Sequence, residues 1–291
     1  LILVTGATGS GKSTTLAGIL HRINTSRHGH IVTIEDPIEF LHDDAMCRIT
    51  QREVGADTAD FARALRQVVR QSPDVILIGE LRDLDSMQVA LAAALTGHLV
   101  FASLHTIDAA QTLQRILTYF PEHVRAQAAL DLSLSLHAVV SQRLVPRADG
   151  NGRVVAVELL TVTPAARRLI RDQRVEELHD MLRGSTDPAL RSFNTSLLEL
   201  YRAGKISADT GKAYASNPEE FTLATQGMTT GVGTFQRDSI ESISGLDMKA
   251  LLALAMEKGA SDLHLTVGRP PIFRIAGALH PLRVRPLSDA D

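Results

Sequence analysis

The sequence predicts an α/β fold built on a mostly parallel sheet, and two observations carry that prediction. Short, almost wholly apolar runs of strand length recur along the first 160 residues. Helical patterns separate them, as in chains whose parallel strands are joined by crossover helices. Because strands that are apolar at nearly every position are buried on both faces, we expect helices on both sides of the sheet.

The elements follow in order along the chain. Four segments have the character of buried strands: residues 1–5, 31–34, 75–78 and 99–104. Helices are predicted over residues 58–70 and over residues 84–95, the second rich in Ala and Leu. Residues 163–223 have a helical pattern throughout, broken at Gly184, Gly204 and Pro218, and predict a small helical subdomain.

These patterns divide the chain into four parts: an α/β core over residues 1–160, a helical subdomain over 161–226, a linker or disordered tail over 227–245, and a last segment over 246–291. The third part is rich in Gly, Thr and Ser and has little periodicity. The last segment predicts a helix over residues 248–258 and two strands, over 262–267 and 272–275. A piece of this size is small for an independent domain.

Composition favours a soluble globular protein. Hydrophobic residues make up 44% of the chain, and 30 basic against 33 acidic residues leave a net charge of −3, so no nucleic-acid partner is expected. No apolar run approaches the roughly 18 residues of a spanning helix, so direct membrane insertion is not expected. The single Cys47 excludes an internal disulfide and fits a reducing, cytoplasmic compartment.

A phosphate-binding loop follows the first predicted strand and directly precedes a helical pattern. Nine residues satisfy G-x-x-x-x-G-K-[ST]: Gly6, Ala7, Thr8, Gly9, Ser10, Gly11, Lys12, Ser13 and Thr14. Loop N–H groups at a helix N-terminus bind phosphate, Lys12 adds a positive charge for the β- and γ-phosphates, and Ser13 can ligate Mg²⁺. The motif predicts ATP and Mg²⁺ as ligands; the alternative is a Gly-rich turn with a surface lysine.

Two clusters with acidic residues follow predicted strands: residues 35–39 after the strand at 31–34, and residues 79–83 after the strand at 75–78. Hydrolysis needs a carboxylate to activate the attacking water and another group to help hold the metal. Ligands of open α/β sheets lie at the carboxyl ends of strands, so both clusters should face the phosphate loop. Gly79 stands where many related enzymes have an aspartate. We therefore assign Glu80 to the magnesium shell, through water, and Glu39 as the base. The alternative for each is an ordinary surface or capping carboxylate.

Histidines and arginines near these strands are further candidates. His98 and His105 flank the strand at 99–104, and two histidines so placed favour sensing of the γ-phosphate or coupling between subunits over a purely structural role. Asp36 and Arg82, from the acidic clusters, are assigned to the same group. Three further arginines share one helical face, either a solvated charged face or an intersubunit or phosphate contact: Arg63, Arg66 and Arg70.

Taken in order, these motifs resemble those of secretion ATPases. The matching segments are the phosphate loop 6–14, the acidic box 34–39, an atypical Walker B segment 76–80 and a histidine box 96–106, and the likeness extends over residues 1–223. Residues 51–55 and 79–83, without a four-cysteine element, are similar to the type IV pilus retraction branch, the PilT/PilU family. Residues 130–136 and 142–146 favour PilU over PilT.

The resemblance implies a RecA-like P-loop ATPase domain that works in a homo-hexamer and binds ATP between subunits. It further implies retraction of type IV pili through the inner-membrane platform protein, hence twitching motility, from the cytoplasmic side of the inner membrane, and a possible paralogous retraction ATPase as partner. The helical segment 169–178 aligns with an element that the family associates with retraction, but it lacks the usual small-residue, Gly-containing form.

The last segment resembles the start of the family's amino-terminal, PAS-like domain, yet here it comes last. The likeness rests on residues 248–252, 258–265 and 268–271. We expect a rearranged chain, a window of a tandem fusion or an artificially joined sequence. We expect the remainder of that domain, which in the family supplies arginines to a neighbouring nucleotide, to be absent, so that ATP binding survives better than turnover.

Two other functions compete with the motor. An accessory subunit would bind nucleotide, hydrolyse little and work beside a catalytic paralogue. A small-molecule P-loop kinase would instead need a lid and an acceptor pocket, whereas this sequence offers a histidine box and a helical tail.

Overall fold

The computed structural model describes residues 1–185, 187–226, 251–252, 255–256, 260–267, 270–275 and 278–281. Contacts divide the chain into two units, Leu1–Thr230 and Gly231–Asp291, and each is described by itself. The predicted linker over residues 227–245 lies outside the described residues.

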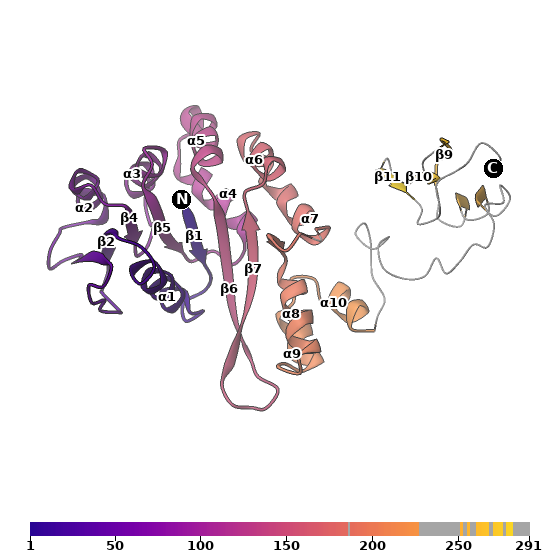
Figure 1. Ribbon diagram of the computed structural model, residues 1–291, viewed down its shortest axis with the longest axis horizontal. Coiled ribbons are helices and arrows are strands. Elements are labelled where there is room, and N and C mark those ends of the chain that lie inside the picture. The colour runs from indigo at the N-terminus through magenta and orange to yellow at the C-terminus, as the bar shows by residue number, and fades with distance from the viewer. Residues whose placement is uncertain are drawn as a thin grey trace. The chain divides into compact units, whose positions relative to one another are not determined.

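The strands of the first unit form one eight-stranded sheet with the spatial order β3-β2-β4-β5-β1-β6-β7-β8 (Figure 1). Their bounds are β1 Ile2–Thr5, β2 Gly29–Glu35, β3 Cys47–Glu53, β4 Val75–Ile78, β5 Leu99–Leu104, β6 Ala138–Pro146, β7 Arg153–Thr161 and β8 Leu190–Arg191. Strands β1 to β6 run parallel, and β7 and β8 pair antiparallel. The predicted mostly parallel sheet is confirmed.

Helices lie on both faces of this sheet. Their bounds are α1 Lys12–Asn24, α2 Phe61–Val68, η1 Val69–Gln71, α3 Leu84–Leu95, α4 Ala109–Tyr119, α5 Glu122–Ser135, α6 Pro164–Arg171, η2 Val175–Glu177, α7 Leu178–Arg183, α8 Phe193–Arg202, α9 Ala208–Tyr214 and α10 Pro218–Thr225. Leu16 and Leu20 of α1 pack on one face of the sheet. Buried side chains of α2 to α7 form the larger core on the other face.

Three aspartates start the helices that follow the strand ends. Asp60, Asp83 and Asp108 cap α2, α3 and α4, and each carboxylate accepts a hydrogen bond from a backbone N–H in the first turn. The caps fix where the loops after β4 and β5 end. Those loops carry Glu80 and His105, so the caps also limit where these two side chains can lie.

A long antiparallel hairpin, β6 and β7, extends beyond the parallel strands (Figure 1). Its part near β1 contributes Val139 and Leu160 to the larger core. Its far part contributes Val145 and Ala156 to a separate cluster with α8 and α10. The hairpin therefore belongs to both the sheet and the helical region.

Several elements differ from the sequence-based expectation. Strands β3, β6 and β7 were not predicted. β3 has few apolar residues, a polar run 141–143 interrupts the apolar residues of β6, and Glu158 interrupts those of β7. The predicted helix over residues 58–70 is shorter, since Asp60 caps α2 and the chain then tightens into η1. The region 163–223 is mostly helical, yet β8 within it pairs with β7. The boundary near residue 160 stays a prediction.

The second unit contains a three-stranded antiparallel sheet with the order β11-β10-β9. The strands are β9 Asp262–His264, β10 Ile272–Ile275 and β11 Ala278–Pro281, the last not predicted. Of the helix predicted over residues 248–258, the described residues 251–252 and 255–256 are helical. Its likeness to a PAS-like domain stays a prediction. In the described part of the chain, no helix is long and apolar enough to span a bilayer.

Candidate functional site

The loop between β1 and α1 depends on three glycines with positive φ. These are Gly6, Gly9 and Gly11, at φ of 146°, 76° and 91°. A Cβ at Gly6 would lie 2.5 Å from the Gln142 carbonyl oxygen and from the Ser10 hydroxyl oxygen. Glycine therefore allows the loop to approach β6 closely, and Gly11 starts α1 with a left-handed N-cap.

Lys12 lies at the start of α1 with only 8% of the residue exposed. Its Nζ donates to the carbonyl oxygens of Gly6 at 2.9 Å and Ala7 at 3.2 Å, and it lies 3.3 Å from Nδ1 of His105. Burial lowers the pKa of Lys12, while the carboxylates of Glu80 and Glu39 act in the opposite direction. An ammonium group can only donate, so Nδ1 of His105 is the acceptor in this contact.

Glu80 contacts two side chains, His105 and Arg82, and Arg82 extends this network to Asp36. Its Oε1 lies 3.3 Å from Nε2 of His105, and its Oε2 accepts from Nε of Arg82 at 2.7 Å. Nη1 of Arg82 also lies 3.1 Å from Oδ2 of Asp36. The hydrogen bond to Glu80 is the main cause of a raised pKa of Arg82. Because Arg82 is 52% exposed, these pairs add little stability and mainly orient the carboxylates.

The ends of β2 and β4 approach each other closely at Gly79. Its N–H donates to the Ile34 carbonyl at 2.7 Å, and its own carbonyl accepts from the Ser103 hydroxyl at 2.5 Å. A Cβ at this position would be 3.2 Å from Cα of Glu35. This contact is a physical reason for glycine where an aspartate is more usual. The assignment of the acidic role to Glu80 stays a prediction.

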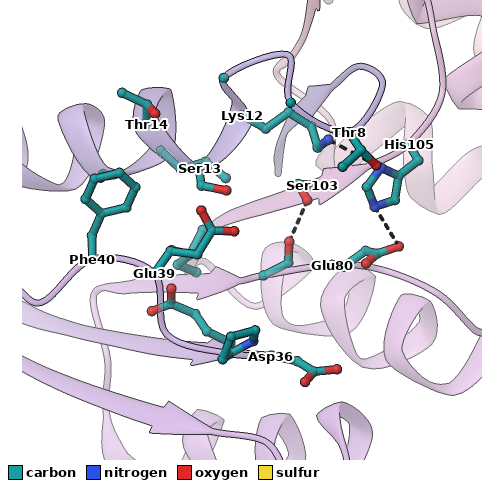
Figure 2. Close-up of a pocket in the computed structure, with 18 of the residues that line it drawn as sticks. Thr8, Lys12, Ser13, Thr14, Asp36, Glu39, Phe40, Glu80, Ser103 and His105 are labelled. Carbon is teal, nitrogen blue, oxygen red and sulfur yellow. Dashed lines mark hydrogen bonds and ion pairs between the residues drawn. The ribbon is translucent and has the colours of Figure 1, made fainter.

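Residues of the phosphate loop and of the loops after β2, β4 and β5 line one cavity of about 410 Å³ (Figure 2). The phosphate-loop residues Thr8, Gly9, Gly11, Lys12, Ser13 and Thr14 lie on one side, and Glu35, Asp36, Glu39, Glu80 and His105 also line it. In Figure 2 the Glu39 carboxylate points toward the start of α1, where Ser13 and Lys12 lie. The cavity therefore combines a cation, hydroxyls and carboxylates along a helix N-terminus.

Other predicted residues lie around the cavity or away from it. Ala7 and Ser10 line a neighbouring cavity of about 300 Å³ that shares Thr8 and Gly9. His98 is held by Ala93 and Thr96 at the opposite end of β5 from His105. A strand of this length separates the two histidines by about 20 Å. His98 therefore does not line this cavity, and its role in sensing the γ-phosphate or in coupling between subunits stays a prediction.

The cavity also includes residues that the sequence did not single out as site residues. Glu35, Ser103, Leu144 and Arg153 line it. Glu35 and Ser103 lie within quoted motifs, so their closeness to a strand end was an available signal. Leu144 and Arg153 come from the β6–β7 hairpin, which the sequence pattern did not predict. The arginines Arg63, Arg66 and Arg70 are exposed and do not line the cavity.

The donor set suits a hard divalent cation. Hydroxyl and carboxylate oxygens are the ligands that Mg²⁺ prefers, and it commonly binds with one or two carboxylates and substrate phosphates. Ser13, Glu39 and Glu80 supply such oxygens in one cavity. Among the described residues, no cluster of three His, Cys, Asp or Glu side chains could hold a metal ion by itself. Ser13 and the carboxylates fit Mg²⁺ that arrives with phosphate.

The fold and the cavity define a P-loop protein of the RecA-like α/β class. The family model described as type II/IV secretion system protein matches residues 1–243. The chain belongs to this family.

Two curated relatives are equally similar. The type IV pilus retractation ATPase PilT of Pseudomonas aeruginosa is 45% identical over 221 residues, 76% of this chain and 64% of PilT. The type IV pilus ATPase PilU of the same organism is 45% identical over 223 residues, 77% of this chain and 58% of PilU. The chain thus spans about three fifths of the length of these relatives.

Solved structures agree with this assignment. The crystal structure of the pilus retraction motor PilT with bound ADP has a TM-score of 0.70 and 44% identity, covering 75% of this chain and 62% of that one. The Legionella pneumophila ATPase DotB has a TM-score of 0.66 and 29% identity, covering 78% of this chain and 60% of that one. The first is named as a pilus retraction motor and the second as an ATPase.

Proposed function

We propose that the chain is an ATP-hydrolysing motor subunit that powers retraction of type IV pili and hence twitching motility. The observation that carries the proposal is one cavity in which Lys12 of the phosphate loop faces Glu39 and Glu80, in a chain 45% identical to a pilus retraction ATPase.

Nucleotide binding follows from the phosphate loop. The loop N–H groups and the N-terminus of α1 would bind the β- and γ-phosphates, and Lys12 would exchange its contacts with the Gly6 and Ala7 carbonyls for phosphate oxygens. Ser13 and Glu80, the latter through water, would hold Mg²⁺. When bound, Mg²⁺ neutralises phosphate charge during transfer.

Glu39 is the candidate base for hydrolysis. Its side chain is on the cavity wall opposite the loop that would hold the γ-phosphate, and it has no charged hydrogen-bond partner among the described contacts. Glu80, in contrast, is bound on both oxygens by Arg82 and His105. A carboxylate free to accept a proton from water suits a general base, and one held on both oxygens suits a fixed electrostatic role.

Asp36, Arg82 and His105 are the proposed sensing group. His105 bridges Lys12 and Glu80, and Arg82 bridges Glu80 and Asp36. A change in the position of Lys12 or Glu80 on nucleotide binding would therefore be transmitted to the loops after β2 and β5. The proposed partners are five further copies in a hexameric ring, the inner-membrane platform protein and a paralogous retraction ATPase, on the cytoplasmic face of the inner membrane.

A second candidate is an accessory subunit that binds nucleotide but hydrolyses little. The equal identity to PilT and PilU favours neither branch, and it keeps this candidate open beside the motor.

Steady-state ATP hydrolysis at increasing protein concentration tests the proposal, with Lys12→Ala as the blank. Specific activity should rise with concentration, because a site shared between subunits is complete only after assembly. Lys12→Ala should lose at least about 100-fold in kcat, since the cation that neutralises the phosphates is gone. Binding of a fluorescent ATP analogue by the wild type, without turnover above the blank at any concentration, would instead favour the accessory subunit.

A further inference from the structure

The loop between β2 and β3 carries Glu39, and it is held by side chains of the edge strand β3. In the parallel register, Thr33 pairs with Gln51 and Glu35 pairs with Glu53. Residues two apart on a strand point to the same face, so Gln51 and Glu53 face the same side as Glu35. This is the α1 side of the sheet, where Cys47 of β3 packs with Leu16 and Leu20.

The amide of Gln51 makes three contacts at once. Its Nε2 donates to the carbonyl oxygen of Phe40 at 2.9 Å and to Oε1 of Glu35 at 3.2 Å. Its Oε1 accepts from the backbone N–H of His42 at 2.9 Å. One half-buried side chain therefore fixes the backbone at Phe40 and at His42, on the carboxyl-terminal side of Glu39.

Glu53 completes the anchorage on the other side of Glu39. Its Oε2 accepts from the backbone N–H of Ile38 at 3.0 Å. Backbone groups of residues 38, 40 and 42 are thus bound to β3, and the Glu39 backbone lies between them. Glu35 is held in turn by the Thr33 hydroxyl at 2.6 Å, which keeps the acceptor for Gln51 in place.

The two ends of the loop are held elsewhere, Asp36 by Arg82 and residues 43–46 by Asn24 of α1. Around Glu39 itself the loop is exposed. Leu41 is 89% exposed and Phe40 is 40% exposed, so apolar burial does little to fix the loop. Figure 2 shows Phe40 and Glu39 side by side along this loop, with Glu39 directed into the cavity. Hydrogen bonds from β3 are therefore the main restraint on the position of the Glu39 carboxylate.

We propose that Gln51 is a positioning residue for ATP hydrolysis, which holds the Phe40–His42 backbone so that Glu39 faces the γ-phosphate site. The proposal rests on the proposed function and adds to it a residue that does not line the cavity. Misplacement of a base by about 1 Å can cost 100-fold in rate. Binding of nucleotide depends on the phosphate loop and should be preserved, because the hydrogen bonds of Gln51 go to Glu35, Phe40 and His42 instead.

The test compares Gln51→Leu with Gln67→Leu in the full chain. Leucine is similar in size to glutamine but can make none of the three hydrogen bonds. Gln67 is an exposed residue of α2, and its substitution controls for the change from glutamine to leucine. Gln51→Leu should lower kcat by about 10- to 100-fold while the Kd of a non-hydrolysable ATP analogue changes by less than about twofold, because only the transition state needs the placed base. Gln67→Leu should match the wild type in both.

Amide hydrogen exchange gives a second readout that needs no turnover. In Gln51→Leu, the N–H of His42 and its neighbours should exchange at least about tenfold faster, whereas α1 and β4 should be unchanged. An unchanged kcat, or a weakened analogue Kd together with a lower Tm, would overturn the proposal. Absence of turnover in the wild type would count against the proposed function alone; unchanged exchange in the loop would still overturn the role of Gln51.

Discussion

A nearly buried carboxyl group, Glu158, joins the sheet to the helical region. It lies on β7, is 4% exposed, and accepts from the N–H of Ala109 at the start of α4 at 2.8 Å. Burial raises its pKa to about 7; the neighbouring Asp108 acts in the same direction, and Arg143 opposes it. Folding therefore favours the neutral carboxyl of Glu158 below about pH 7.

Stability should fall with rising pH because of Glu158. The folded pKa of about 7 is above the ordinary 4.5, so the folded state binds more protons between these values. The loss between pH 4.5 and 7 is at most about 3 kcal/mol in the free energy of unfolding. Glu158→Gln, neutral at every pH, should reduce this loss, so the variant should be more stable than the wild type at pH 8.

Urea unfolding at pH 5 and pH 8 measures this difference. Glu176→Gln, at an exposed position of η2, is the matched control and should leave the pH dependence unchanged. An equal pH dependence in Glu158→Gln and the wild type would show that Glu158 ionises freely in the folded protein.

Two mid-helix glycines differ in what surrounds them. Gly211 of α9 is buried against the ring of Phe221 in α10, and an added Cβ would overlap that ring. Gly18 of α1 has no atom within 4 Å of an added Cβ. The packing of α9 on α10 thus depends on a missing side chain, whereas α1 has no such requirement.

The same substitution should have opposite effects at these sites. Gly211→Ala should lower the free energy of unfolding by about 1–3 kcal/mol, because the helices must separate or Phe221 must move. Gly18→Ala should raise it by roughly 0.5–1 kcal/mol, since alanine loses less backbone entropy in a helix. Urea unfolding of both variants measures the two changes, and a stabilising Gly211→Ala would contradict the close packing of α9 and α10.

The elements that sequence predicted are those whose burial is complete. β1, β2, β4 and β5 have buried residues at most positions, and their apolar runs identify them without tertiary information. The edge strand β3 and the hairpin β6–β7 are half exposed, and which of their residues are buried depends on which neighbour covers each face. The neighbours that cover these strands are known only from the folded structure.

The candidate site also has a part that the sequence identifies and a part that only the fold brings together. The phosphate loop is contiguous, and spacing alone identifies it. The chain of contacts from Lys12 through His105 to Glu80 joins residues far apart in sequence, and strand order decides that they meet. His98 and His105 have the same local signal, yet the direction of β5 brings only His105 to the cavity. Gln51 is polar on an edge strand, which by itself indicates an exposed side chain.

At the scale of the whole molecule, the first unit has its own hydrophobic cores. All members of the three apolar clusters lie between Leu1 and residue 221. A chain ending at residue 230 should therefore unfold in one cooperative transition, with a Tm within about 3 °C of the full chain, because a domain with its own core folds alone. Differential scanning calorimetry of both chains measures this, and loss of the transition in the shorter chain would contradict it.

The β6–β7 hairpin has a mechanical consequence. Nine residue pairs join its two strands. They begin at Ala138, which pairs with β1, and end at Pro146, next to the cluster formed with α8 and α10. Gln142 of β6 also donates to the Thr15 hydroxyl of α1 at 2.7 Å. A hydrogen-bonded ribbon resists stretching far better than a loop does. We therefore expect the hairpin to couple the positions of α8 and α10 to that of α1, which starts at the phosphate loop.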